Sequence, residues 1–271
     1  MDFYPAQGWN LGFTLQDGDL TNSQGGNVDR NAVSISGGRT SPDTDWNSKL
    51  EWRKDSGAEQ REQWVSTNRF THKINESWRI AARLNYSETE DELVAAAGAK
   101  FVEGNVGFAW RPWNSTRWGV FGRYTYLYDL STFTEAGGQL GGAQYDQKSQ
   151  IVSLEGVYKH DQHWEFAAKA AQRSGEVRFG RMMGEWEDSD TTFIAGQIRY
   201  ELRTQWHALA EYRWLDVTDG GTRSGWLVGV DRDINKNFRV GVGYNFTDFS
   251  DDLTDFDYDH KGWFLNMTGT Y

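Results

Sequence analysis

The sequence contains no cysteine, only three prolines and only five histidines among 271 residues. Without cysteine, disulfides and thiolate metal sites are excluded. No stretch approaches the roughly 18 apolar residues that a membrane-spanning helix needs, and helical periodicity is almost absent. Phosphate loops, zinc motifs and dinucleotide fingerprints are missing too, so we expect no cofactor and no metal site.

The charge balance of the chain is acidic, with 39 Asp and Glu against 28 Lys and Arg and a formal net charge of −11. Nucleic-acid binding needs a cationic surface, so nucleic acid is excluded as a main partner. The N-terminal residues MDFYPAQGWN lack the basic start and apolar core of a signal peptide. If the protein is exported, we expect this numbering to begin at a mature or truncated form.

Strict alternation of apolar and polar side chains dominates the sequence, although its mean hydropathy is only −0.74. In the last eleven residues, KGWFLNMTGTY, the apolar face carries Trp263, Leu265, Met267 and Tyr271. Strand side chains alternate between two faces. Similar runs of about 9 to 15 residues recur along the chain, where ordinary strands have about five or six. A tilted strand that crosses a bilayer needs roughly 9 to 11 residues, which these runs satisfy.

Short polar turns alternate with longer acidic loops, and an aromatic residue opens the strand after each short turn. Many returning strands end on an aromatic at the same level. Tyr and Trp rings settle at membrane–water boundaries, so these residues predict an interfacial girdle. The girdle residues are Trp9, Trp46, Trp78, Trp118, Trp164, Trp206, Phe238 and Tyr271.

The alternation predicts an all-β chain of about 14 antiparallel strands, with 12 or 16 left open because the first four alternate less cleanly. The predicted ranges are 9–16, 28–40, 45–54, 60–72, 76–87, 99–112, 116–129, 147–159, 163–174, 190–203, 205–216, 224–234, 236–249 and 260–271. A soluble β-sandwich or propeller also alternates. Long paired strands and 14 tryptophans, many opening a strand, favour the membrane barrel instead.

With its turns, loops, girdle and terminal aromatic, the chain resembles a Gram-negative outer-membrane β-barrel of the porin-like kind. The resemblance covers residues 1–271 as a single domain. It implies a transmembrane up-and-down barrel in the bacterial outer membrane, with short periplasmic turns and long acidic extracellular loops. Its implied partners are outer-membrane lipid, lipopolysaccharide and the barrel-assembly machinery, which reads the C-terminal strand. Residues 241–271 are also similar to the barrel domains that end large multidomain surface proteins.

The polar face has thirteen basic candidates against seven acidic ones. An electropositive lumen would favour anions. Alternatively, Arg and Glu on neighbouring strands pair into ladders and leave little net field. Inward phenylalanines such as Phe121 and Phe193 would narrow a passage, and inward glycines such as Gly241 and Gly243 would free space. The predicted pore-lining residues are Arg79, Arg83, Glu103, Arg117, Arg123, Glu155, Lys169, Arg199, Glu211, Arg213 and Arg239.

These features predict a passive channel for small hydrophilic solutes, with anions favoured. The second hypothesis is a plugged barrel that anchors or translocates a larger surface protein. The third is an enzyme at the outer rim, where His260 lies near Asp257 and Asp259. No serine partner accompanies that cluster, so we predict no catalytic residue. The acidic spacing at Asp255, Asp257 and Asp259 suggests calcium, but His260 stands where an EF-hand loop needs glycine, which favours simple loop solvation.

Overall fold

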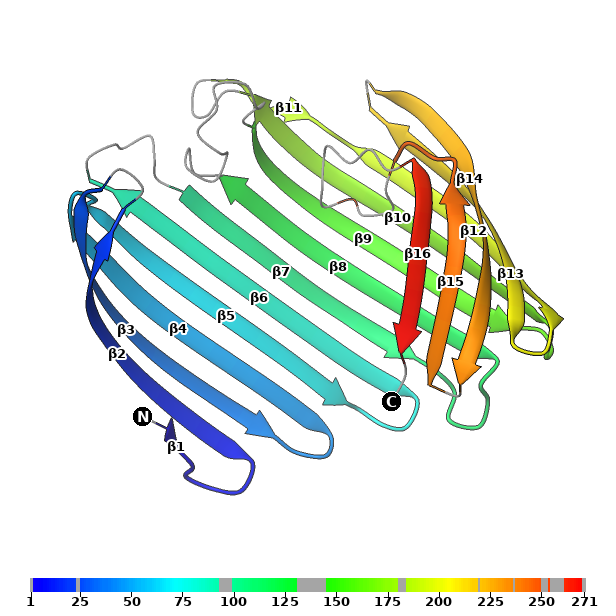
Figure 1. Cartoon of the computed structure of the whole chain (residues 1–271), viewed down its shortest axis with the longest axis horizontal. Helices are drawn as coiled ribbons and strands as arrows, with labels where there is room; N and C mark the ends of the chain where they lie inside the picture. Colours follow the sequence, from blue (N-terminus) through cyan, green and yellow to red (C-terminus); the bar gives the residue numbers. More distant parts are fainter. Residues whose placement is uncertain are drawn as a thin grey trace.

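The computed structural model describes residues 2–22, 25–92, 99–130, 145–179, 184–218, 220–235, 237–249, 253 and 261–269. These residues form one antiparallel sheet of sixteen strands that follow one another in chain order, except that β11 pairs only with β10 (Figure 1). The described residues contain no helix long and apolar enough to cross a membrane. Every regular element of the described residues is a β-strand, as the alternation predicts.

Fourteen strands have eight residues or more, and two have only two residues. The short ones are β1 (Asp2–Phe3) and β11 (Glu187–Asp188). The long ones are β2 (Trp9–Thr21), β3 (Asn27–Thr40), β4 (Thr44–Gly57), β5 (Arg61–Lys73), β6 (Trp78–Asp91), β7 (Ala99–Trp110), β8 (Trp118–Leu130), β9 (Tyr145–Lys159), β10 (Trp164–Phe179), β12 (Thr191–Arg203), β13 (Trp206–Val217), β14 (Gly221–Asn235), β15 (Phe238–Asn245) and β16 (Gly262–Gly269). Each long strand overlaps one of the predicted ranges.

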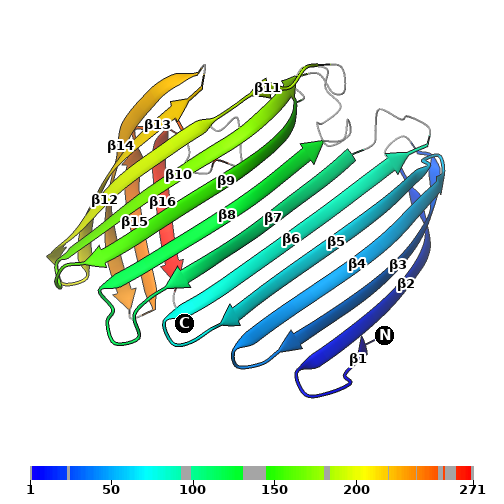
Figure 2. The ribbon, with the colours of Figure 1, turned by 180° about the vertical axis from the view of Figure 1, so that it is seen from behind.

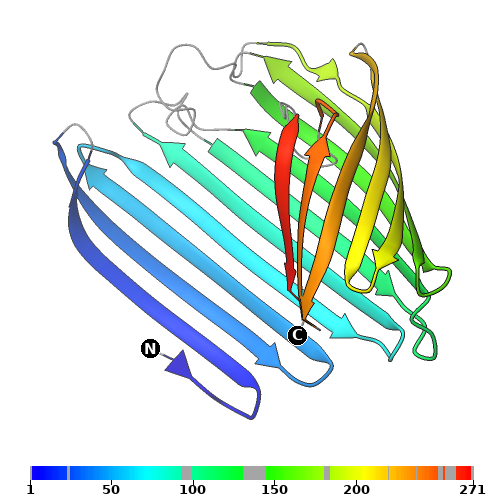
Figure 3. The ribbon, with the colours of Figure 1, turned by 45° about the vertical axis from the view of Figure 1, so that its right-hand side comes forward.

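The sheet is a curved wall with two open edges. From behind, β2 to β10 and β12 run side by side as one broad face (Figure 2). On the other side, β13 to β16 turn round in front of this face, and β16 stays apart from β2 (Figures 1 and 3). Within the described residues, no pairing joins β16 to β2, and β2 carries only the two-residue β1 on its outer side. The predicted closed barrel is thus present as an open wall.

Several connections on the predicted long-loop side are short. Strands β2 and β3 are joined by 22–26, β4 and β5 by 58–60, and β13 and β14 by 218–220. The long connections on this side are 131–144, 180–190 and 246–261. These three connections are shorter than the predicted strand ranges imply, because β2, β4 and β14 extend further than the alternation indicates.

Side-chain acceptors fix two of the short turns. Asn75 Oδ1 accepts the backbone N–H groups of the second and third residues after it, at 2.9 and 3.0 Å, and Asp161 Oδ1 does the same at 2.7 and 2.8 Å. Such bonds fold Asn and Asp into turns. In each case the third residue is a girdle aromatic, Trp78 or Trp164. The N–H groups donating to Asp161 hold the pKa of its carboxyl below the ordinary value.

The two faces of the sheet differ in exposure and chemistry. Ile151 is 4% exposed, whereas the next residue, Val152, is 59% exposed, so neighbours along β9 face opposite sides. The outer face carries exposed apolar side chains from β2, with Phe13 at 46%, to β16, with Leu265 at 70%. Exposed apolar surface on this scale is not stable in water for a monomer. The inner face carries most of the charged residues of the strands.

A hydrophobic cluster covers part of the inner face. It joins side chains from β9, β10, β12 and β13 to Phe249 and Leu253 in the connection after β15. Phe193 is fully buried in this cluster, and its ring centroid lies 6.5 Å from that of Phe249. Strand β15 ends at Asn245, before the predicted 249, because the chain bends inward there. Phe249 and Leu253 of this acidic connection are thus packed against the wall, whereas Asp255, Asp257 and Asp259, for which solvation is predicted, lie outside the described residues.

Two inward glycines lie under neighbouring side chains. A Cβ on Gly241 would collide with the carboxylate of Asp231, and one on Gly243 would collide with the Phe264 ring and lie 2.5 Å from the carbonyl oxygen of Val228. The prediction that these glycines free space in the lumen is wrong at both positions, since a carboxylate and a ring occupy it.

Gly243→Ala is therefore expected to destabilise the fold by about 1–3 kcal/mol, the usual cost of overpacking, because the Val228 carbonyl belongs to the backbone of the sheet. Gly156→Ala is the matched control, since a Cβ at Gly156 meets no atom within 4 Å. The free energy of unfolding in urea, followed by tryptophan fluorescence, checks both. Equal stability of the two variants would contradict the packing described above.

Candidate functional site

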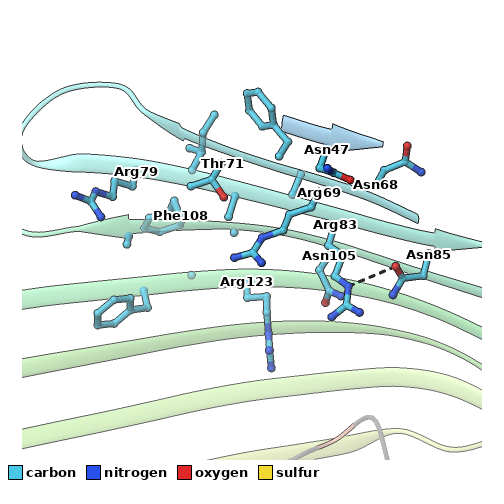
Figure 4. Close-up of a pocket in the computed structure, with 18 of the residues that line it drawn as sticks. Asn47, Asn68, Arg69, Thr71, Arg79, Arg83, Asn85, Asn105, Phe108 and Arg123 are labelled. Carbon is cyan, nitrogen blue, oxygen red and sulfur yellow. Dashed lines mark hydrogen bonds between the residues drawn. The ribbon is translucent and has the colours of Figure 1, made fainter. Parts of the chain in front are cut away.

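A hollow of about 830 Å³ lies on the inner face over β4 to β8. Its polar lining includes Arg69, Arg79, Arg83 and Arg123, which we call the arginine quartet. Figure 4 shows Arg69 on β5 and Arg83 on β6 side by side, Arg123 on β8 extending away from them, and Arg79 toward one end. All four side chains are exposed.

Small residues form the floor of the hollow. Ala81 on β6 lies opposite Gly107 on β7, and Gly107 lies opposite Arg123 on β8. Arg79 and Arg83 lie two residues to either side of Ala81 on the same strand face, because side chains on one face recur every second residue. The register therefore centres the quartet on a depression that no large side chain fills.

Two members of the quartet face each other directly. Arg69 on β5 and Arg83 on β6 are register partners. Like charges opposite each other on a sheet are destabilising, because their Cβ atoms are only about 4.5–5.5 Å apart. Throughout the described ranges, no carboxylate lies within ion-pair distance of any quartet member. Among the described residues, the Arg83 side chain makes one hydrogen bond, a long one of 3.4 Å from Nε to Asn85 Oδ1.

One acid near the hollow, Glu103, is occupied by amides. Glu103 accepts hydrogen bonds from Asn85 Nδ2 at 3.1 Å and from Asn105 Nδ2 at 2.8 Å. Asn105 in turn accepts a bond of 2.6 Å from the buried Thr125 hydroxyl. Because these amides satisfy both oxygens of Glu103, the carboxylate stays at the margin of the hollow and the quartet remains uncompensated.

Elsewhere on the inner face, arginines are paired with acids. Arg199 lies 3.1 Å from Glu165 and 3.2 Å from Asp231, which is only 3% exposed. Arg239 donates to Asp233 at 2.6 Å, and Arg213 pairs with Glu211. On the N-terminal strands, Arg30 binds Asp55 through two bonds of 2.7 Å, and Glu51 lies between Lys49 and Arg53. The inner face therefore carries unpaired arginines around the hollow and paired arginines elsewhere. Each predicted alternative thus describes a different part of the wall.

The structure distributes the predicted pore-lining residues over three places. Arg79, Arg83 and Arg123 line the hollow, with Glu103 at its margin. Arg117 lies in the turn before β8 and is exposed. The others lie on the inner face of β9 to β15: Glu155, Lys169, Arg199, Glu211, Arg213 and Arg239. Arg69 is absent from the prediction because the alternation of β5, REQWVSTNRFTHK, is irregular; its position opposite Arg83 follows only from the register.

The predicted girdle residues within the described ranges lie at the short-turn ends of their strands. Trp118 contacts Tyr158 with ring centroids 4.3 Å apart, and Trp164 contacts Tyr200 at 4.5 Å. Trp9, Trp78, Trp118, Trp164 and Trp206 are all at least 37% exposed on the outer face. Trp46 and Phe238 open β4 and β15 at the same level but are less exposed. Tyr271, like Asp255, Asp257, Asp259 and His260, lies outside the described residues.

Similarity to known proteins is visible in structure alone, because no protein-family model and no curated protein sequence matches this chain. The siderophore receptor PirA from Pseudomonas aeruginosa matches with a TM-score of 0.57 and 12% identity, over 90% of this chain and 44% of the receptor. A mutant of the ferric enterobactin receptor PfeA from the same organism matches at 0.55 and 8%, over 88% and 43%. The toluene transporter TodX from Pseudomonas putida scores only 0.42 at 10%, over 87% and 81%.

The two receptors are outer-membrane β-barrel proteins, and their similarity to this chain confirms the predicted resemblance at the level of fold. The chain spans less than half the length of the two receptors.

The contrast between paired and unpaired arginines predicts opposite effects on stability. Arg199→Gln leaves the buried Asp231 without its counter-ion, and loss of one partner of a buried pair costs about 3–5 kcal/mol. Arg69→Gln removes a like-charge contact and is expected to stabilise by roughly 0.2–1 kcal/mol. Urea unfolding of both variants measures the difference. Equal losses of stability would mean that Arg69 also has a structural partner.

Proposed function

We propose that this chain forms the wall of a bacterial outer-membrane β-barrel and acts as a passive channel for small hydrophilic solutes, with anions favoured. The observation that carries the proposal is an inner face with a hollow and four uncompensated arginines, backed by an outer face of exposed apolar side chains. No chemical step is involved, since passage depends on partitioning and on the field of the wall.

The outer face supports a membrane location. Its exposed apolar residues extend from Leu11 to Met267 across the long strands, and its aromatic belt follows the short turns. In lipid such a face is favourable, while tryptophans at one level anchor the boundary. Outer-membrane lipid and lipopolysaccharide are the proposed surroundings of this face, and the barrel-assembly machinery is the proposed partner of β16.

Closure of the wall by β2 and β16 is part of this proposal. Unpaired N–H and C=O groups in hydrocarbon each cost several kcal/mol, so a spanning sheet needs both edges satisfied. The two edge strands run in opposite directions, as an antiparallel ladder requires. Both also present apolar residues outward, Phe13 on β2 and Leu265 on β16. Strand β1 pairs with only Leu11 and Gly12 of β2. Pairing of β16 with β2 would therefore displace only this short β1–β2 ladder.

The proposed passage runs along the N-terminal half of the wall. On β9 to β13 the cluster around Phe193 fills part of the inner face with buried apolar side chains. Over β5 to β8 the inner face is open and basic. Confined charges of one sign raise the local concentration of counter-ions. An anion would therefore meet the arginine quartet on its way through.

A second candidate is a plugged barrel that anchors a larger surface protein. The specific observation in its favour is the inward fold of the connection after β15, which buries Phe249 and Leu253 against the wall. If the remaining space is filled in the same way, conduction stops and anchoring is the function. A rim enzyme has no supporting geometry, because His260 lies outside the described residues.

Conductance of the refolded chain in a planar lipid bilayer, under a salt gradient, separates the first two candidates. We expect steady single-channel currents and a reversal potential of the sign that anion selectivity gives. The selectivity should weaken as ionic strength rises, because salt screens the arginine field. Insertion of the chain into the bilayer without measurable current would reject the channel and favour the anchoring function.

Cross-linking tests closure, and the absence of cysteine makes it direct. Cysteine at Phe13 is combined in turn with cysteine at Trp263, Leu265 or Met267, which share its outward parity. Opposed strand residues lie about 4.5–5.5 Å apart, within disulfide range, so one of the three pairs should oxidise in lipid vesicles. Cysteine at the inward Phe264 or Asn266 is the control and should not cross-link with position 13. If no outward pair forms, β2 and β16 do not meet.

A further inference from the structure

We infer that the hollow of the arginine quartet is a binding subsite for short linear polyanions, molecules that carry two or more carboxylate or phosphate groups along a chain. This inference rests on the proposed function at the same wall but goes further, since a passive channel needs no binding site. Guanidinium groups bind carboxylate and phosphate through paired charge-assisted hydrogen bonds.

The spacing of the quartet favours several anionic groups over one. Arg69 and Arg83, as register partners, present two guanidinium groups that can hold one oxyanion between them. Arg123 lies two strands and two residues away from Arg83, which is about 12 Å between Cα atoms at ordinary sheet spacing. Arg79 is at a similar distance from Arg123 on the other side of Ala81. One bound oxyanion therefore leaves two arginines for further groups.

The electrostatics of the wall point the same way. Arg199, Arg213 and Arg239 on the same wall have acids as partners, whereas the quartet, in the part of the chain described, has none. An oxyanion between Arg69 and Arg83 would convert a repulsive contact into an attractive one. The floor of Ala81 and Gly107 leaves room for a ligand to lie on the wall.

Polar and aromatic groups around the quartet add contacts along a chain-like ligand. Asn47, Thr67 and Thr71 line the same hollow and offer donors and acceptors for hydroxyl or ester oxygens. Phe121, also in the lining, is 48% exposed. An exposed ring face suits stacking of a sugar ring, whereas a phosphate chain gains nothing from it.

Isothermal titration calorimetry of the refolded chain in zwitterionic micelles tests the inference with four probes: tripolyphosphate, trigalacturonate, phosphate and acetate. We expect the first two to bind at least about tenfold more tightly than the last two, the effect of one added charge-assisted contact. The double variant Arg69→Gln with Arg83→Gln should lose about tenfold or more in affinity for both polyanions.

The matched control is Arg111→Gln with Arg117→Gln, which removes the same charge from exposed arginines in a short turn outside the hollow. Its affinity should stay within about twofold of the parent chain. Phe121→Ala identifies the ligand: a selective loss for trigalacturonate assigns sugar acids, and no loss for either probe assigns phosphate chains.

Two results would overturn the subsite: equal affinities for the single anions and the polyanions, or equal losses in the quartet and control variants. Parallel bilayer recordings keep this inference separate from the proposed function. Conduction without polyanion binding removes the subsite and retains the channel. Binding without conduction retains the subsite and removes the channel.

Discussion

The whole structure depends on one constraint, the alternation of side chains across a wall that is a single sheet thick. Each strand must satisfy two environments with successive residues, so an apolar outer face fixes which positions remain for the inner face. A slip of one residue would exchange the faces of a strand completely. There is no second layer to compensate for an error. The exposure difference between Ile151 and Val152 shows this constraint at a single step along β9.

Because the wall is one sheet thick, charged side chains on the inner face form ion pairs with residues on other strands of the same sheet. Arg199 reaches Glu165 on β10 and Asp231 on β14, and thereby connects strands that are not adjacent. Such pairs contribute specificity of register as well as energy, since a displaced strand leaves a buried charge alone. The cluster around Phe193 strengthens the same half of the wall. The described buried apolar cluster thus lies in the half of the wall from β9 to β15, and the open hollow with the arginine quartet lies over β4 to β8.

The sequence alone predicts the strands and the girdle, because both depend on local order: alternation within a run, and an Asn or Asp three residues before Trp78 and Trp164. It does not predict features that depend on contacts between distant segments. Phe249 belongs to an acidic connection whose composition indicates a solvated loop, yet it packs on Phe193. The crowding of Gly241 by Asp231 and the pairing of Arg69 with Arg83 require the register. Closure of the sheet into a barrel also depends on the distance between β2 and β16, and no local sequence pattern predicts that distance.

Local and global preferences agree along most of this chain, as they do in sequences that specify one structure. They disagree at the arginine quartet. A register that pairs Arg69 with Arg83 could be relieved by one acidic or neutral substitution, and the same wall uses such pairs at Arg30, Arg213 and Arg239. Glu103, which lies on the strand next to Arg83, is instead held by two asparagine amides. Sites where local structural preferences conflict with the overall fold are expected to be functional. The stability lost at the quartet is therefore best explained by an anion that the wall receives from outside the chain.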